Sequence, residues 1–223
     1  MRGPLVSVVV PVFNGEAFLG EALESVFAQN YEPLEVIVVN DGSTDRSGEI
    51  AKSDARIRYL EQPNRGASSA RNLGVAVASG TFIGFVDADD VIPPTKFSDQ
   101  IGYLLEHPEI DCVLGRQDWI EEPEGLARDV VWGDPDGIPL MSMVLRSNVL
   151  REIGGYVEEH GGDMDMLVRL RASGHGIAVL PQMVLHRRYH GNNLVAGRAL
   201  APIPPISLKL KLDAERARRA SGA

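Results

Sequence analysis

Short apolar runs rich in β-branched residues alternate with stretches of helical periodicity along the first half of this chain. The apolar runs lie at residues 5–10, 34–39, 57–60 and 81–86. The stretches predicted to be helical include about 16–28, 68–78 and 94–106. This alternation predicts the α/β class, with a mostly parallel, Rossmann-like central sheet flanked by helices. Ligands of such sheets bind beyond the carboxyl ends of the strands.

The second half of the chain has a less regular pattern. Residues 111–145 contain the acidic "EEPE" and the turn-rich "WGDPDGIP", which are typical of a loop or lid rather than of another strand and helix. Asp163 or Asp165 can cap a helix that Gly174 ends. Residues 177–180 form the next predicted strand.

Length and proline content suggest how the chain is organised. With 223 residues, of which 44% are hydrophobic, it can bury one substantial core, so we expect a single domain over residues 1–195. Prolines at positions 202, 204 and 205 then predict a stiff linker, and residues 196–223 are expected to form this linker and a basic C-terminal tail. The arginines of the tail are compatible with peripheral contact with an anionic membrane surface.

Charge and cysteine content exclude some classes of protein. The formal net charge of -9 argues against non-specific nucleic-acid binding, which requires a clustered basic face. Cys112 is the only cysteine, so no intrachain disulfide can form, and the cytoplasm is the expected compartment, including the inner face of its membrane for the tail. The apolar stretch near the N-terminus is too short for a signal peptide or a membrane span.

The run "FVDADD" places Asp87, Asp89 and Asp90 directly after a predicted buried strand. One of the last two acids could cap a helix that opens near Pro94. Three carboxylates this close repel one another unless a cation or hydrogen-bond donors offset the charge, and hard divalent metals favour such oxygen ligands. Because Mg²⁺ often completes its shell with substrate phosphates, a nucleotide in the crevice would fit.

Glycine-rich phosphate loops do not occur at the expected places. The chain has neither G-x-G-x-x-G after its first strand nor G-x-x-x-x-G-K-[ST] anywhere, so the dinucleotide-binding and P-loop classes are excluded. The first two strands end instead in "PVFNGE" and "VVNDGSTD".

Two long segments together resemble the nucleotide-sugar-binding half of the family 2 glycosyltransferases. They are "SVVVPVFNGEAFLGEALESVFAQNYEPLEVIVVNDGSTDRS" and "NRGASSARNLGVAVASGTFIGFVDADD". The resemblance implies the GT-A fold, with a nucleotide-sugar-binding half at 1–95 and an acceptor-side half at 96–195. It also implies an inverting transfer of a sugar from a nucleotide donor, usually a UDP-sugar, assisted by Mn²⁺ or Mg²⁺.

The resemblance assigns donor-side roles to residues of both segments. Asp87-Ala88-Asp89 matches the family's D-x-D motif, in which the first acid faces the ribose or sugar and Asp89 binds the metal that bridges the diphosphate. The loop that lines the base and ribose is matched by Pro11, Phe13 and Asn14, with Glu16 just beyond.

Asn40 and Asp41 match a pair that is often two acids in relatives, one of which accepts a hydrogen bond from the uracil N–H. An amide oxygen can also accept that bond. A turn and a helix cap are the alternative role for Asp41. Arg71 and Asn72 match the "ARN" signature and, on this resemblance, contact the base or diphosphate. The alternative for Arg71 is an ordinary surface ion pair on a helix face.

On the acceptor side, "GGDMD" matches a place that usually reads Glu-Asp in relatives, where the Asp is the catalytic base. Gly162 replaces the Glu and Asp163 keeps the acid, so Asp163 is the predicted base and Asp165 the alternative; an N-cap role is open for either. "LHRRYHGNN" resembles the family's R-x-H ending, which places Arg188 near the diphosphate and makes His190 a metal ligand or phosphate contact, or else a structural histidine.

The expected partners are a UDP-sugar donor and an acceptor that is a glycan, a lipid-linked compound or a small molecule, with no nucleic acid; a homodimer is compatible with the sequence. Two other classes stay open. A nucleotidyltransferase would also use an acidic metal site, although it should carry a basic phosphate loop near the first strand. A non-catalytic nucleotide-sugar-binding protein would keep Asp41 and Asp89 but needs no base.

Overall fold

The computed structural model describes residues 3–120, 140–157, 162–188 and 190. Its core is a seven-stranded sheet in the order β3-β2-β1-β4-β6-β5-β7. The strands are β1 (Val6–Val12), β2 (Leu34–Asn40), β3 (Ile57–Glu61), β4 (Phe82–Phe85), β5 (Cys112–Trp119), β6 (Val144–Arg146) and β7 (Ile177–Arg187). Only β6 runs antiparallel to its neighbours, β4 and β5, so the mostly parallel sheet predicted from the sequence is confirmed.

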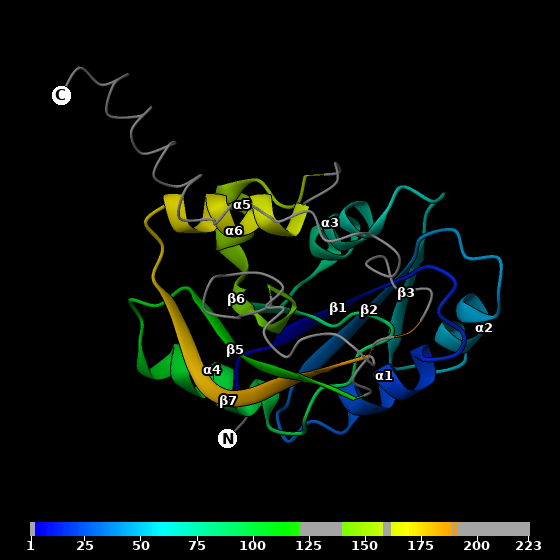
Figure 1. Cartoon of the computed structure of the whole chain (residues 1–223), viewed down its shortest axis with the longest axis horizontal. Helices are drawn as coiled ribbons and strands as arrows, with labels where there is room; N and C mark the ends of the chain where they lie inside the picture. The colour runs from blue at the N-terminus through cyan, green and yellow to red at the C-terminus, as the bar shows by residue number, and fades with distance from the viewer. Residues whose placement is uncertain (1–2, 121–139, 158–161, 189, 191–223) are drawn as a thin grey trace, which may run out of the picture.

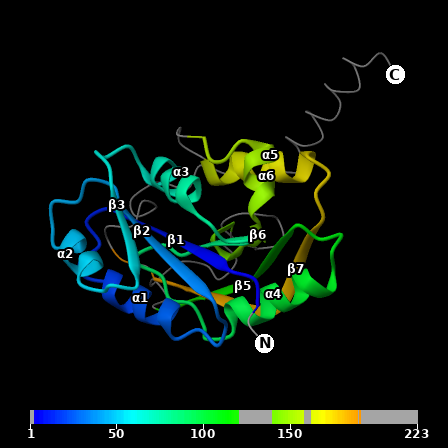
Figure 2. The same cartoon turned by 180° about the vertical axis from the view of Figure 1, so that it is seen from behind.

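Helices cover both faces of this sheet (Figures 1 and 2). They are α1 (Leu19–Phe27), α2 (Ser47–Lys52), α3 (Ala67–Val77), α4 (Lys96–Glu106), α5 (Ser147–Ile153) and α6 (Gly162–Ala172), with a 3-10 turn, η1 (Leu140–Ser142). Both views place α3, α5 and α6 on one face and α1 and α4 on the other. Among the described residues, no helix combines the length and apolar character needed to cross a membrane.

Strand β1 lies inside the sheet and all seven of its residues are buried. Val8 pairs with Val36 of β2 on one side and with Gly84 of β4 on the other. At position 84 only glycine allows α4 to pack this closely, because an added Cβ would lie 2.7 Å from the ring of Phe97. The uncharged runs at 5–10 and 81–86 therefore become the centre of the core, as buried parallel strands do.

The second half contains more regular structure than the sequence predicted. Residues 111–145 were expected to form a loop or lid, yet this region holds β5, η1 and the start of β6; residues 121–139 lie outside the described part. Strand β7 continues well beyond the predicted 177–180. Pro181 does not end it because β7 is the outer strand of the sheet, where a proline can face away from the pairing partner, and the β5–β7 register is shifted in this region. The linker and tail, residues 196–223, also lie outside the described part.

A buried polar group, the Lys96 amine, joins α4 to the 3-10 turn η1. Lys96 is fully buried, and its Nζ donates a hydrogen bond to the carbonyl oxygen of Ser142 at 2.8 Å. Gln100 donates to the same oxygen at 2.8 Å and to the carbonyl oxygen of Val113 at 3.0 Å. Burial lowers the pKa of Lys96 to about 7, so near neutral pH a large part of this amine is uncharged inside the protein.

The lowered pKa of Lys96 makes the free energy of unfolding increase with pH. Between about pH 7 and the ordinary lysine pKa of 10.5, the unfolded chain holds a proton that the folded chain has released, so raising the pH stabilises the fold. The cost of burying Lys96 is therefore largest at low pH and disappears as pH rises through this range.

We predict that Lys96→Met melts at a higher temperature than the parent at pH 7, and that the difference narrows towards pH 10. Gln100 can still satisfy the Ser142 carbonyl in the variant, so little is lost. A gain of several degrees is expected, because each kcal/mol shifts the melting temperature of a chain of this size by about 2–4 °C. Melting curves of both proteins from pH 6 to pH 10 provide the measurement. Identical pH slopes would show that Lys96 titrates normally.

Candidate functional site

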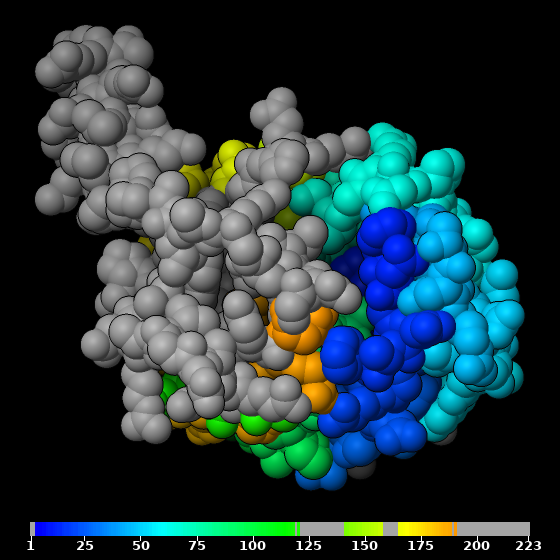
Figure 3. Space-filling view, turned by 45° about the vertical axis from the view of Figure 1, so that its right-hand side comes forward, coloured from blue at the N-terminus to red at the C-terminus, as the bar shows by residue number. Residues whose placement is uncertain are grey.

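Loops that follow β1, β2 and β4 meet at one edge of the sheet and enclose a cavity of about 570 Å³. These strands are parallel neighbours, so their carboxyl ends must lie together. The end of β7 and the segment after it join them through Arg187 and His190. Figure 3 shows the orange residues of this part of the chain beside the blue ones of the N-terminal part.

Ten of the predicted donor and metal residues line this cavity: Pro11, Phe13, Asn14, Glu16, Asp41, Arg71, Asp87, Ala88, Asp89 and His190. Two do not. Asn40 and Arg188 are absent from the lining of the cavity and are held elsewhere by hydrogen bonds described below. The side chain of Asp163 lies outside the described part of the structure, although its backbone is the second residue of α6.

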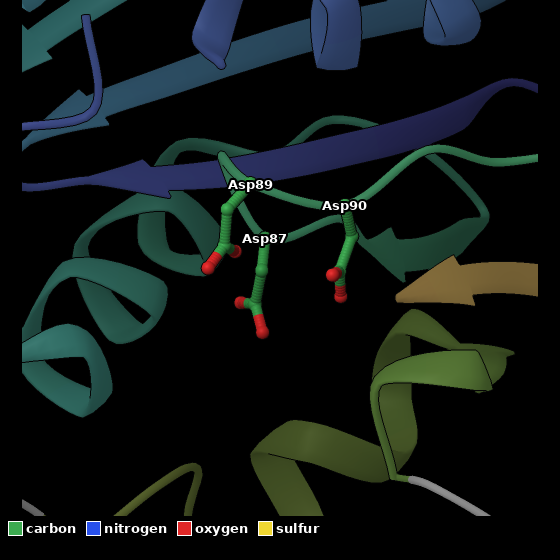
Figure 4. A group of neighbouring side chains, drawn as sticks. All are labelled: Asp87, Asp89 and Asp90. Atoms are coloured by element: carbon green, nitrogen blue, oxygen red, sulfur yellow. The ribbon is translucent and has the colours of Figure 1, made fainter. Parts of the chain in front are cut away.

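The acidic cluster is Asp87, Asp89 and Asp90, on the loop that leaves β4 (Figure 4). One carboxylate oxygen from each lies within 4.8 Å of the others. Burial, and then the charge of Asp87, raises the pKa of Asp89; the same causes raise the pKa of Asp90 to about 8. Such shifts report that like charges are held together in a poorly hydrated place. This oxygen donor set fits a divalent cation.

Helix capping does not explain the acidic cluster. The helix after it, α4, has Thr95 at its N-cap position, and no side chain makes a capping hydrogen bond there. The alternative in which Asp89 or Asp90 caps that helix is therefore wrong. Asp90 accepts a hydrogen bond from the backbone N–H of Arg188 at 3.1 Å instead, so this carboxylate is directed to the segment after β7.

Arg71 places a positive charge beside the cluster. It projects from α3, is only 5% exposed, and its Nη2 donates to Asp87 Oδ1 at 2.6 Å. The alternative of an exposed surface ion pair is therefore wrong. A buried guanidinium offsets part of the carboxylate repulsion and fixes the direction of Asp87.

The segment after β7 contacts the acidic cluster through Arg188 and His190. His190 Nε2 lies 3.1 Å from Asp89 Oδ2, and its ring packs on Phe18 with centroids 4.6 Å apart. Arg188 Nη2 donates to Glu21 of α1 at 2.5 Å, and Nε donates to the backbone oxygen of Asp89 at 3.3 Å. In this structure the Arg188 side chain therefore points to α1 rather than into the cavity.

Hydrogen bonds also join the loops that follow β1 and β2. The Asn14 side chain accepts from the Thr44 N–H at 2.8 Å, and the Glu16 carboxylate accepts from the Arg46 N–H at 3.0 Å. In the other direction, Asp45 accepts from the Glu16 N–H at 2.9 Å. Asn14 adopts the left-handed conformation, with φ of 50°, which asparagine tolerates better than most residues. These side chains build the wall of the cavity.

The adjacent residues Asn40 and Asp41 have different surroundings. Asn40 is 3% exposed; its amide donates to Tyr59 Oη at 2.8 Å and accepts from the Ser43 N–H at 2.9 Å. Since both ends of the amide are engaged away from the cavity, the expectation that Asn40 contacts the donor is not supported.

Asp41 reaches the cavity and is held firmly. Its carboxylate accepts hydrogen bonds from Gln62 Nε2 and from the backbone N–H groups of Arg65 and Gly66, at 2.7, 2.9 and 2.8 Å. Asp41 is therefore a fixed, oriented acceptor at the end of β2.

On the acceptor side, α6 carries Asp163 and Asp165. Asp165 Oδ2 accepts from Arg169 Nε at 2.6 Å, one helical turn further on. Asp165 is thus already engaged by a cation of its own helix.

Sequence reasoning missed several residues of the cavity, among them Phe18, Asp45, Asn64 and Arg187. Phe18 lies in the stretch 16–28 that was predicted to be helical, and Asp45 ends the run "VVNDGSTD"; neither residue was given a role in the site. Asn64 opens the segment "NRGASSARN", which carries part of the family resemblance, but no role was assigned to this residue. Arg187 could have been found, because it precedes Arg188 in a segment already singled out.

Comparison with known proteins identifies the family. A model described as glycosyl transferase family 2 matches residues 7–154, about two thirds of the chain. Among curated proteins, a glycosyltransferase of Bacillus subtilis (strain 168), EpsJ, described as uncharacterized, is 52% identical over 114 residues. The match covers 49% of this chain and 33% of EpsJ, so the chain spans about a third of the length of that relative.

Solved structures share the fold. S. aureus TarS in complex with UDP-GlcNAc has a TM-score of 0.74 at 22% identity, over 91% of this chain and 62% of that chain. Glucosyl-3-phosphoglycerate synthase from Mycobacterium tuberculosis, in complex with Mn²⁺, UDP and phosphoglyceric acid, has a TM-score of 0.66 at 21% identity, over 84% and 72%. The expected GT-A fold is confirmed. With its family model matched over most of its length, this chain belongs to glycosyl transferase family 2.

Proposed function

We propose that this protein transfers a sugar from a nucleotide-sugar donor, a UDP-sugar, to an acceptor hydroxyl, with inversion at the anomeric carbon. The observation that carries the proposal is the pairing of Asp87 and Asp89 at a cavity that also contains Asp41. A fixed carboxylate suits the base end of a nucleotide, and an acidic cluster suits a metal-bound diphosphate. The family match and the fold likeness to proteins crystallised with UDP-GlcNAc and UDP support it.

On the donor side, the loop after β1 supplies the wall against which the nucleoside lies. Phe13 is half exposed at this wall and offers a flat apolar surface to a base. Asp41 is oriented to accept a hydrogen bond from the uracil N–H, and Arg71 holds Asp87 towards the ribose or the sugar. Most donor contacts are therefore assigned to residues 1–95.

Asp89 is the residue proposed to hold a divalent ion, Mn²⁺ or Mg²⁺, together with His190, whose imidazole already lies beside it. When bound, the ion would offset the charge that develops on the leaving diphosphate. Mn²⁺ is present in the structure of the mycobacterial relative, which supports this choice. Asp90 is proposed to keep the segment after β7 in place through the Arg188 N–H rather than to face the donor.

Asp163 is the proposed general base. It would take the proton of the acceptor hydroxyl while the oxygen forms a bond to the anomeric carbon, and the bond from that carbon to the diphosphate oxygen breaks on the opposite face. A single displacement inverts the configuration and requires no covalent intermediate. The ion pair of Asp165 with Arg169 supports Asp163 over Asp165, because the Asp165 carboxylate is already held by the guanidinium of its own helix.

The metal assignment predicts that Asp89→Asn weakens UDP binding only when Mn²⁺ is present. The amide removes the charge that holds the ion while keeping the size of the side chain. We expect at least about a tenfold loss of affinity, because even indirect partners of a metal are worth 10- to 100-fold. Calorimetric titration with UDP, with and without Mn²⁺, measures this. Asp99→Asn on α4 is the control, and equal affinity of Asp89→Asn and parent at saturating Mn²⁺ would contradict the assignment.

The base assignment predicts that Asp163→Asn loses about 10²- to 10⁴-fold in transfer rate, the usual contribution of a general base. UDP affinity should stay near that of the parent. The melting temperature should change little, because an asparagine oxygen can still cap a helix. Rate, affinity and melting temperature are measured on this variant and on Asp165→Asn. A fully active Asp163→Asn beside an inactive Asp165→Asn would move the base to Asp165.

A further inference from the structure

The turn formed by Gly154, Gly155 and Tyr156 follows α5 and is held by a side chain of α6. Arg169 donates hydrogen bonds to the backbone oxygens of Ile153 and Gly155, the latter at 2.5 Å, while Asp165 fixes its Nε. Both glycines have positive φ, 90° and 69°, so this path is one that other residues rarely adopt. The guanidinium thus joins α6 to this turn at two points.

Asn72 of α3 holds the same turn from the other side. Its Nδ2 donates to the Tyr156 carbonyl oxygen at 2.7 Å, and its Oδ1 accepts from the Tyr156 N–H at 2.8 Å. The amide therefore pairs with the backbone as a neighbouring strand would. The approach is close: a Cβ added to Gly155 would lie 2.8 Å from Asn72 Oδ1. Both overall views show α3 beside α5 and α6 on one face of the sheet.

The turn also touches the donor side of the site. The guanidinium carbon of Arg71 lies 5.4 Å from the centre of the Tyr156 ring, and the same guanidinium donates to Asp87. The rings of Tyr156 and Phe85, the last residue of β4, pack in a T-shaped arrangement with centroids 5.4 Å apart. One turn therefore contacts the strand and the arginine that position the acidic cluster, and also the helix that carries Asp163.

We propose that Asn72 is a positioning residue, which sets α6 and so Asp163 at a fixed distance from the acidic cluster by pairing with Tyr156. This rests on the proposed function, in which Asp163 is the base. Asn72 itself does not line the donor cavity, so its effect on the reaction passes through the turn and α6. Arg169 completes the clamp from the opposite side. A displacement of about 1 Å of a catalytic group can cost about 10²-fold in rate, so a clamp of this kind has a measurable consequence.

The test compares the full-length parent with Asn72→Asp, which keeps the acceptor for the Tyr156 N–H but cannot donate to its carbonyl. Asn148→Asp is the matched control, because Asn148 is exposed and its amide donates only to Glu152 in the described contacts. Two properties are measured: amide hydrogen exchange over residues 166–172, and steady-state turnover and UDP affinity in Mn²⁺, with UDP-GlcNAc as the first donor tried among a panel of UDP-sugars.

For Asn72→Asp we expect exchange in α6 to accelerate at least about tenfold, because locally opening states become more populated when the turn is released. The turnover number should fall about 10- to 100-fold while the KM for donor and UDP affinity stay within about twofold. Asn148→Asp should match the parent. Arg169→Lys, which keeps the charge but cannot reach both carbonyls as a fork, should show the same pattern and serves if Asn72→Asp does not fold.

Unchanged exchange in α6 would overturn the proposal, as would a loss of turnover matched by an equal loss of UDP affinity, which would place Asn72 in the donor site. If the parent turns over no UDP-sugar, the proposed function fails, and the exchange data alone then support or overturn the clamp.

Discussion

Repulsion among the carboxylates of Asp87, Asp89 and Asp90 is the constraint on which the arrangement of this site depends. The acids follow a fully buried strand, and one of them, Asp90, is itself 2% exposed. Asp87 and Asp89 are only partly exposed, so water screens the three carboxylates incompletely, and the protein places two arginines, a histidine and N–H groups beside them. Arg71 comes from α3, Arg187 from the end of β7 and His190 from the segment after β7, and each lies within 4 Å of a different acid of the cluster. Elements far apart in sequence are therefore drawn to one edge of the sheet.

The length of strand β7 brings residues that are distant in sequence to the acidic cluster. The strand starts beside β5 at the edge of the sheet distant from the acids and ends with His186 paired to Val91, just after them. Its length delivers the segment containing Arg188 and His190 across the acidic loop. Pro181 lies within β7 and does not end it, because an outer strand of a sheet tolerates proline.

The sequence predicted those features that are encoded locally. Uncharged runs became buried strands, and the D-x-D acids and Asp41 were placed at the ends of strands because loops of parallel neighbours must converge. Features that depend on distant partners were missed. Asn40 is turned away by Tyr59, nineteen residues further on, and Arg188 is turned to Glu21 of α1; no local pattern reports either contact. Strand β5 was not predicted because glycine, arginine, glutamine and aspartate follow its short apolar start.

The hydrogen bonds between the loops after β1 and β2 bear on how this site can change. Asn14 and Glu16 each bind the backbone of the other loop, and Asp45 binds back, so neither loop can be altered without leaving a polar group of the other unpaired. Exchanging one loop for that of a relative would disturb the wall of the cavity even if every other side chain that lines it were kept. Residues 13–16 and 43–47 form a single module, and changing which ligand this cavity accepts requires moving both together.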